Sequence, residues 1–309
     1  MGRDDRGPAQ GGGVEPGSAR LRRALLDADP RLSAFDPLPR ILFHDDFDRG
    51  MCGWTLMTGN YERSLETLLP QQRDFRPPML SNLTMWDTGT AGSLHGSYAM
   101  KLATRPAPGS IAVGIKRMTA TDAVPIRLEA WFTVKPEATR MRLSENDTRA
   151  FGVFLDLQDE SERVMPHVRY ANATHGVQQR NWQYKKDRPA TTDISRETRT
   201  HFHIGPDGWL DLPGGAQELC YNELPTKQNW HYLRLGFDLA ARRFTELRCN
   251  DVEFDHDALQ AIRMPAWPNL RSMLNVGFWV ETDVANRSFL YLDSVLLSAD
   301  RPEGKGEAR

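Results

Sequence analysis

The chain has 309 residues, and its 39 Lys and Arg residues nearly balance 41 Asp and Glu residues, which gives a formal net charge of -2. This balance, without any basic stripe, excludes the electrostatic footprint expected of a nucleic-acid-binding protein. No apolar stretch approaches the roughly 20 residues of a membrane-spanning helix. We therefore expect neither a nucleic-acid partner nor a membrane partner.

The N-terminus and the cysteines point to a cytoplasmic protein. Residues 1–7 are charged and contain no apolar core segment, so they do not read as a secretory signal. Cys52, Cys220 and Cys249 are an odd number and form no C-x-x-C pair. Free thiols in a reducing compartment are the expected state of such cysteines.

The first 40 residues differ in composition from the rest of the chain. The start is rich in Gly, Pro and charge, a composition typical of disorder. Ser18 is a candidate N-cap, Leu21 and Leu25 recur at helical spacing, and Pro30 would end the helix. We divide the chain into a disordered arm (1–20), a short helix and linker (21–40), a single β-sandwich domain (41–299) and a frayed C-terminus (300–309).

The body of the chain alternates apolar and polar residues with period two, the pattern of strands half buried in a sheet. In the run 126–134, Ile126, Leu128 and Phe132 share one face, and the run 151–157 repeats the pattern. Further runs of this kind are 41–48, 96–103, 109–118, 277–281 and 289–298.

The clearest hairpin lies between residues 230 and 254. Leu233, Leu235 and Phe237 point one way in its first strand. Asn250 and Asp251 can supply the positive φ angles of a tight turn between its second and third strands. Helical signal is confined to the N-terminus and residues 257–262, and no sequence repeat occurs, so the chain reads as all-β.

The acidic strands at the two ends (41–48 and 289–298) and the late strand–strand–turn–strand pattern resemble the concanavalin A-like lectin/glucanase superfamily, specifically an uncharacterised bacterial branch. The resemblance implies a jelly-roll sandwich of two antiparallel sheets with the first and last strands side by side. The superfamily includes lectins, carbohydrate-binding modules, glycoside hydrolases and polysaccharide lyases, so the fold alone does not choose among these functions.

The resemblance also implies a structural Ca²⁺ where the terminal strands meet. Its matching ligands are Asp46 (or Asp45) and Asp293, with backbone carbonyls from residues 96–98. Calcium takes six to eight oxygen ligands, so two carboxylates, carbonyls and water would suffice. The alternative is that Asp45, Asp46 and Asp48 are solvated charges or caps of turn amides.

The densest run of side chains suited to ligand binding is residues 165–186. Trp182 and Tyr184 share one face of a strand there, and aromatic planes stack on the C–H face of a sugar while polar groups bind its hydroxyls. We predict a sugar site on a concave sheet; the alternative is an ordinary exposed sheet face. The predicted ligand-binding residues are Trp182, Tyr184, Asn181, Gln183, Asp156, Arg234, Trp131 and Glu129.

Catalysis stays open. Retaining hydrolysis needs two carboxylates about 5 to 5.5 Å apart, and the Glu-x-Asp-x-x-Glu pattern of glucanase members is absent. Glu281 and Asp283 form an i, i+2 pair on a late strand. A lyase needs a base and a charge neutraliser. His167, Arg169 and Tyr170 supply these residue types and are the predicted catalytic residues if the protein is an enzyme.

We therefore expect recognition of a carbohydrate or small glycoside, with Ca²⁺ as the one cofactor. A carbohydrate-active enzyme, hydrolase or lyase, acting in the same cleft is the first alternative. A structural protein that assembles through a sheet face or the N-terminal helix is the second. Trp209, in a Gly-rich excursion of the chain, is either a ligand contact or a plug that holds this loop down.

Overall fold

The computed structural model describes residues 24, 27–57, 76–81, 92–120, 122–137, 144–187, 204–219, 229–266 and 271–301. Within them the strands are β1 (Arg40–Asp45), β2 (Trp54–Leu56), β3 (Met79–Ser81), β4 (Ala99–Ala103), β5 (Ile111–Thr119), β6 (Pro125–Pro136), β7 (Thr148–Gln158), β8 (Glu162–Met165), β9 (His167–Thr174), β10 (Val177–Tyr184), β11 (Leu210–Ala216), β12 (His231–Asp238), β13 (Arg243–Cys249), β14 (Val252–Glu253), β15 (Ile262–Pro265), β16 (Met273–Thr282) and β17 (Ser288–Ala299). The 3-10 helices are η1 (Pro30–Ala34), η4 (Glu145–Asp147) and η6 (His256–Ala258). None of the helices described here combines the length and apolar character needed to cross a bilayer.

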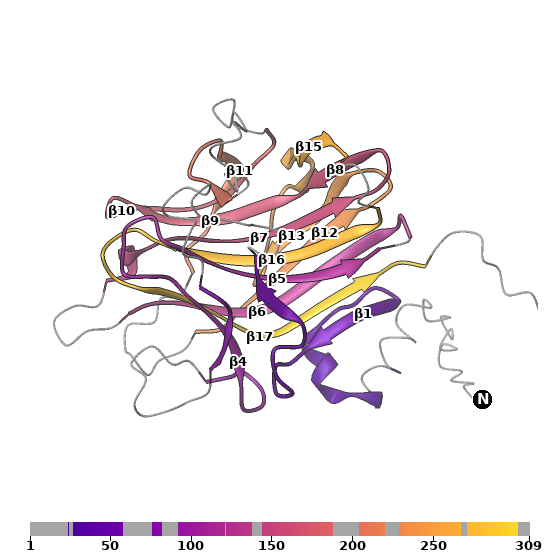
Figure 1. Ribbon diagram of the computed structural model, residues 1–309, viewed down its shortest axis with the longest axis horizontal. Coiled ribbons are helices and arrows are strands. Elements are labelled where there is room, and N and C mark those ends of the chain that lie inside the picture. Colours follow the sequence, from indigo (N-terminus) through magenta and orange to yellow (C-terminus); the bar gives the residue numbers. More distant parts are fainter. Residues whose placement is uncertain are drawn as a thin grey trace, which may run out of the picture.

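These strands form two antiparallel sheets packed face to face (Figure 1). In the described part of the chain, sheet A has the order β14-β13-β12-β6-β17-β4-β3, with β1 also paired to β17. Sheet B has the order β11-β10-β9-β7-β16-β5-β2, with β8 and β15 at the end of β7. The predicted all-β sandwich of two antiparallel sheets is confirmed.

The first and last strands lie side by side, as predicted. In β1, Asp45 pairs with Val295 of β17. On the same edge of β17, Leu292 pairs with Met100 of β4. Between these two pairings the register of β17 shifts, and Asp293 lies in the gap. This bulge places the predicted acidic residue where the two neighbours of β17 meet.

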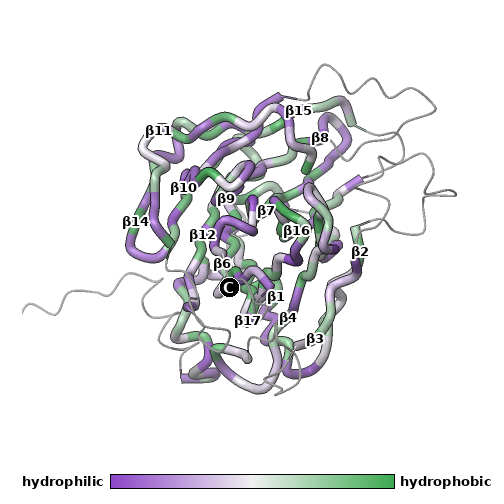
Figure 2. The backbone as a smooth tube through the Cα atoms, turned by 90° about the vertical axis from the view of Figure 1, so that its left-hand side faces the viewer, coloured by the Kyte–Doolittle hydropathy of each residue, from purple (hydrophilic) through white to green (hydrophobic). Residues whose placement is uncertain are grey.

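The core lies between the sheets and follows the period-two alternation. Leu128 of β6, Val153 of β7 and Leu235 of β12 all belong to one buried apolar cluster. Seen along the strands, β10, β9, β7 and β16 lie above β12, β6 and β17 (Figure 2). The alternation predicted these inward faces correctly because one face of each strand must leave water.

The predicted N-terminal helix is not supported. Of that stretch, residues 24, 27 and 28 are helical, and the element with defined bounds is the 3-10 helix η1, which Asp29 caps by accepting the Arg31 amide and which Pro30 begins. Proline suits a first turn because that turn needs no donor from its N–H. The disordered arm, most of the predicted helix and the end of the frayed C-terminus lie outside the described residues.

Candidate functional site

The run predicted to bind a ligand forms β9 and β10, which pair as antiparallel neighbours in sheet B. Alternation sends Tyr170 and Trp182 into the core between the sheets. It sends Arg169 and Gln183 to the outer face, where their side chains meet. The outer face of sheet B is therefore the candidate functional site, and half of the predicted residues face away from it.

The predicted stacking residues Trp182 and Tyr184 are the main correction. Trp182 is fully buried and its ring contacts Phe151 edge-on at a centroid distance of 5.9 Å. Its indole Nε1 donates to Gln217 Oε1 at 2.9 Å. Both aromatic rings belong to the apolar core cluster. They hold the two sheets together and offer no face to a sugar.

A row of polar side chains crosses three neighbouring strands on the outer face. Arg169 Nε on β9 donates to Gln183 Oε1 on β10 at 2.7 Å. Gln183 Nε2 donates to Asp211 Oδ1 on β11 at 2.7 Å, and Asn181 Nδ2 donates to the same oxygen at 3.1 Å. Asp211 is exposed and the other three side chains are half-exposed. The row combines donors and acceptors in fixed positions that solvent reaches.

Trp209 stands at the Arg169 end of this row. The guanidinium carbon of Arg169 lies 4.2 Å from the centroid of its ring, and Lys185 Nζ lies 4.6 Å from it. The indole Nε1 donates to the Gly205 carbonyl at 2.9 Å, which fixes the ring while leaving it half-exposed. Trp209, and not Trp182, is the aromatic plane that adjoins polar groups on this face.

Lys185 and Glu281 lie buried beneath the row. Burial lowers the pKa of Lys185 to about 7, and within the row it lowers the pKa of Arg169 to about 10. Burial also raises the pKa of the Glu281 carboxyl. Arg149 binds both carboxylates of the i, i+2 pair, Glu281 at 3.0 Å and Asp283 at 2.8 Å. Because one guanidinium holds both carboxylates, the structure does not present them as a free acid and base.

The three predicted catalytic residues do not converge. His167 is fully buried beneath the outer face, and its Nε2 accepts a hydrogen bond from Trp279 Nε1 at 2.8 Å. Arg169 is on the same face. Tyr170 points into the core, where its hydroxyl donates to the Gln217 carbonyl at 2.7 Å and burial raises its pKa to about 12.

The remaining predicted ligand-binding residues are divided between the sheets. Asp156 is on the outer face of sheet B, but it is buried and paired with Arg163 at 2.7 Å. Glu129, Trp131 and Arg234 lie on the opposite side of the molecule, on the outer face of sheet A. The prediction that these residues line one sheet is therefore wrong, because strand alternation does not tell which sheet a strand joins.

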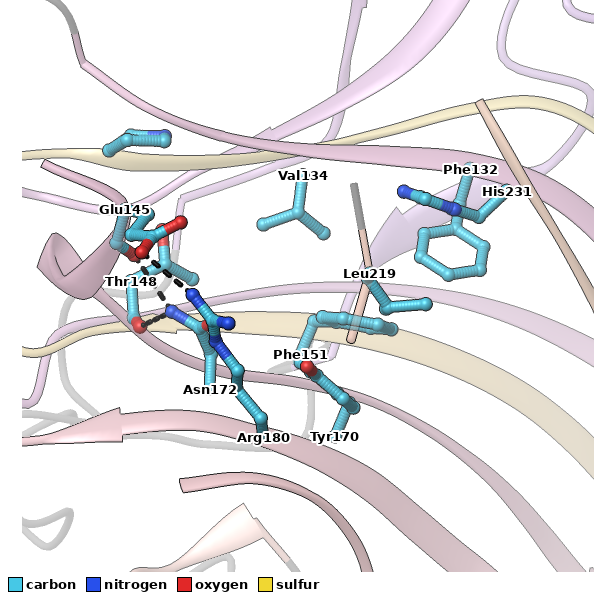
Figure 3. A pocket seen from close by; sticks show the side chains of 11 residues that line it. Phe132, Val134, Glu145, Thr148, Phe151, Tyr170, Asn172, Arg180, Leu219 and His231 are labelled. Atoms are coloured by element: carbon cyan, nitrogen blue, oxygen red, sulfur yellow. Dashed lines mark hydrogen bonds and ion pairs between the residues drawn. The ribbon is translucent and has the colours of Figure 1, made fainter. Parts of the chain in front are cut away.

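A pocket lined by aromatic rings and by polar side chains such as Asn172 and His231 opens at one end of the sandwich, between the sheets (Figure 3). The rings of Phe132 and Phe151 pack against each other in its wall at a centroid distance of 4.8 Å, and Tyr170 lies beside Phe151. At its rim, Arg180 pairs with Glu145 at 2.8 Å. Since these rim charges are already paired, this pocket offers an apolar wall without the row of polar groups that sheet B carries.

The predicted cation ligands are only partly brought together. Asp46 forms an ion pair with Arg31, which removes it as a free ligand. Asp293 is fully buried; its Oδ2 accepts the His95 amide at 2.9 Å and its Oδ1 has no hydrogen-bond partner. Asp48 Oδ1 accepts the Ser97 amide at 2.7 Å. No group of three His, Cys, Asp or Glu side chains in the described part of the chain is placed to hold a metal ion.

A family model described as a domain of unknown function (DUF6772) matches residues 22–301. No curated protein matches the chain. Solved structures with a similar strand arrangement include the potassium-bound carbohydrate recognition domain of Emp46p (12% identity, 86% of this chain and 97% of that chain, TM-score 0.36). Another is the metal-free lectin I-B4 from Griffonia simplicifolia (10% identity, 84% of this chain and 100% of that chain, TM-score 0.39). A third is an endo-β-1,4-glucuronan lyase from the fungus Trichoderma reesei (9% identity, 84% of this chain and 95% of that chain, TM-score 0.41).

Proposed function

The chain belongs to the DUF6772 family, and we propose from its own surface that it binds a carbohydrate on the outer face of sheet B. The observation that carries this proposal is the half-exposed Trp209 ring at the end of the row formed by Arg169, Gln183, Asp211 and Asn181. A sugar needs both kinds of group, since its C–H face stacks on an aromatic plane and its hydroxyls need directional partners.

The geometry favours recognition over glycoside hydrolysis. Hydrolysis needs one free carboxylate and one free carboxylic acid across the bond that breaks. Glu281 and Asp283 are both engaged by Arg149. A carbohydrate-active enzyme remains the second candidate because Lys185 and Glu281, both buried, have shifted pKa values beneath the same face, and such shifts cluster at active sites.

The proposal is tested by calorimetric titration of the protein with a panel of neutral and acidic oligosaccharides. We expect Trp209→Ala to weaken binding at least tenfold. The matched control is Trp131→Ala, which removes a half-exposed tryptophan from the outer face of sheet A and should leave binding unchanged. Equal losses in the two variants would contradict a site on sheet B.

Mass spectrometry of the same mixtures separates the alternatives. A product heavier by one water identifies hydrolysis, and a product without added water identifies elimination. Binding without any product supports recognition alone. If no sugar binds and nothing is turned over, the proposal fails and the assembly alternative takes its place.

We also propose that a Ca²⁺ ion is shared by Asp48 and Asp293 at the bulge of β17. The support is the buried Asp293 Oδ1, which has no hydrogen-bond partner and lies in a low-dielectric site. A buried carboxylate oxygen without a partner is costly, and a cation would compensate it. Backbone carbonyls of residues 96–98 would complete the ligand set.

A further inference from the structure

The outer face of sheet A carries a second pocket, on the opposite side of the molecule from the proposed sugar site. The segment 33–36 is bonded to β6 and β12, and the space between it and Arg248 of β13 has a volume of about 480 Å³ with its open mouth included. The residues that line it are Ser33, Ala34, Phe35, Asp36, Tyr232, Arg234 and Arg248. This pocket contains two arginines and is not part of the sugar site.

The roof of the pocket is held in place by specific contacts. Phe35 is buried in a small apolar cluster with Leu296 of β17. The Asp36 amide donates to Glu129 Oε1 at 2.7 Å, and Trp131 Nε1 donates to the Ala34 carbonyl at 3.3 Å. Because both backbone and side-chain groups fix segment 33–36, the space beneath it is formed before any ligand arrives.

The two arginines of the floor differ in how they are bonded. Arg234 pairs with Glu246, and with Asp36 at 3.2 Å, which fixes the plane of its guanidinium. Arg248 donates through Nε to the Asn250 carbonyl at 2.7 Å. Among the described residues no carboxylate pairs with Arg248, so its terminal amino groups remain available at the half-exposed floor.

The surrounding charges favour an anion over a cation. Three arginines, Arg127, Arg234 and Arg248, lie on this face with the carboxyls of Asp36, Glu246 and Glu129, and the exposed Glu253 of β14 is the strand partner of Arg248 without an ion pair to it. Glu129 is fully buried, its Oε2 has no hydrogen-bond partner, and burial raises its pKa. Arg127 and Arg234 are already paired with Asp36 and Glu246, which leaves the guanidinium of Arg248 as the charge that can meet an anion.

We propose that this pocket binds a small oxyanion, the carboxylate or phosphate group of a small molecule, on the terminal amino groups of Arg248 beside Arg234. A guanidinium presents two parallel N–H donors that match two oxygens of such a group. Arg234, the strand partner of Arg248, is already fixed by its own ion pairs and does not have to be ordered by the ligand.

The test follows the melting temperature and tryptophan fluorescence of the protein as sodium phosphate or sodium propionate is added, with sodium chloride at equal ionic strength as reference. We expect saturable stabilisation by at least one of the two oxyanions. Phosphate alone, or propionate alone, would identify which group the site prefers. No saturable difference from chloride would overturn the proposal.

Three variants locate the effect. Arg248→Gln should weaken oxyanion binding at least tenfold, and Ala34→Trp should abolish it by filling the space while the charges stay. Arg243→Gln removes one exposed positive charge from the same strand, β13, and should bind as wild type does. Equal weakening by Arg243→Gln and Arg248→Gln would show general charge attraction and overturn the site. Sugar binding on sheet B should be unchanged in all three, so the two proposals fail independently.

Discussion

Trp279 of β16 lies directly across Gly152 of β7, and its indole passes over that glycine to reach His167 on β9. A Cβ atom at Gly152 would stand 2.5 Å from Trp279 Nε1. The three strands are neighbours in sheet B, and Gly152 pairs with Trp279 on one side and with Arg169 on the other. The absence of a side chain at Gly152 is therefore what allows the bond between Trp279 and His167.

Gly152→Ala is expected to destabilise the protein by about 1–3 kcal/mol, because a methyl group forced into a packed layer displaces the indole. The measurement is urea unfolding of Gly152→Ala, Trp279→Ala and the double variant. In the Trp279→Ala background the same alanine should cost almost nothing, since the clash is gone. Additive costs in the double variant would contradict the relationship.

Lys185 should make stability depend on pH between 7 and 10. Burial lowers its pKa from 10.5 to about 7. In that range the unfolded chain binds the proton that the folded chain lacks, so the free energy of unfolding falls as the pH drops from 10 to 7. Lys185→Met has no amine to titrate. Its free energy of unfolding, compared with that of wild type at the same pH, should therefore rise as the pH drops from 10 to 7.

The control for this measurement is Lys186→Met, which removes the neighbouring half-exposed lysine. Denaturant unfolding at pH 7, 8.5 and 10 gives the comparison. If the difference in free energy of unfolding between Lys185→Met and wild type is the same at the three pH values, the Lys185 amine does not titrate between pH 7 and 10.

Asp293 should act in the opposite direction at lower pH. Burial raises its pKa from 3.8 to about 7. The folded state therefore holds a proton that the unfolded state releases, and this stabilisation is full below pH 4 and lost as the pH rises through 7. In chelator, Asp293→Asn should flatten the fall in melting temperature between pH 5 and pH 8. If Ca²⁺ binds there, it should raise the melting temperature of wild type at pH 8 but not at pH 5; no effect of Ca²⁺ at either pH would end the cation proposal.

Asp45 anchors the first strand through a buried ion pair. Its Oδ2 accepts Lys116 Nζ at 2.7 Å and Trp54 Nε1 at 2.8 Å. Asp45→Ala should cost about 3–5 kcal/mol because it leaves the lysine charge uncompensated. The measurement is thermal unfolding of the variants. Adding Lys116→Met to Asp45→Ala should recover part of the lost stability. The control Asp257→Ala, at an exposed position, should cost little. If Asp45→Ala is as stable as Asp257→Ala, the ion pair between Asp45 and Lys116 does not stabilise the fold.

The pattern of residues predicted the strands and most inward faces, yet one face was assigned the wrong way round. Trp182 and Tyr184 share a face, as predicted, but that face is the core and not the surface. The signal was present, since two aromatic rings bury more apolar area than the amides of Asn181 and Gln183 on the other side. The larger apolar area of Trp182 and Tyr184 favours placing their face, and not that of Asn181 and Gln183, in the core.

The sequence indicates that Trp209 is either a ligand contact or a plug, and it does not choose between them because Arg169 and Lys185 meet the ring only in the fold. Arg149 was missed because its two carboxylate partners lie more than 130 residues away along the chain. No local signal marks such a residue.

The alternation of apolar and polar residues determined by itself that this chain is all-β, that its core is made by strands such as β6, β7 and β12, and that the acidic ends belong to strands. It did so because each strand must bury one face, a requirement that acts residue by residue. Only the tertiary structure decided that Glu129 and Asp156 lie on different sheets and that Arg169 joins Trp209. Strand order and register arise from packing between distant segments, and period two is the same whichever sheet a strand joins.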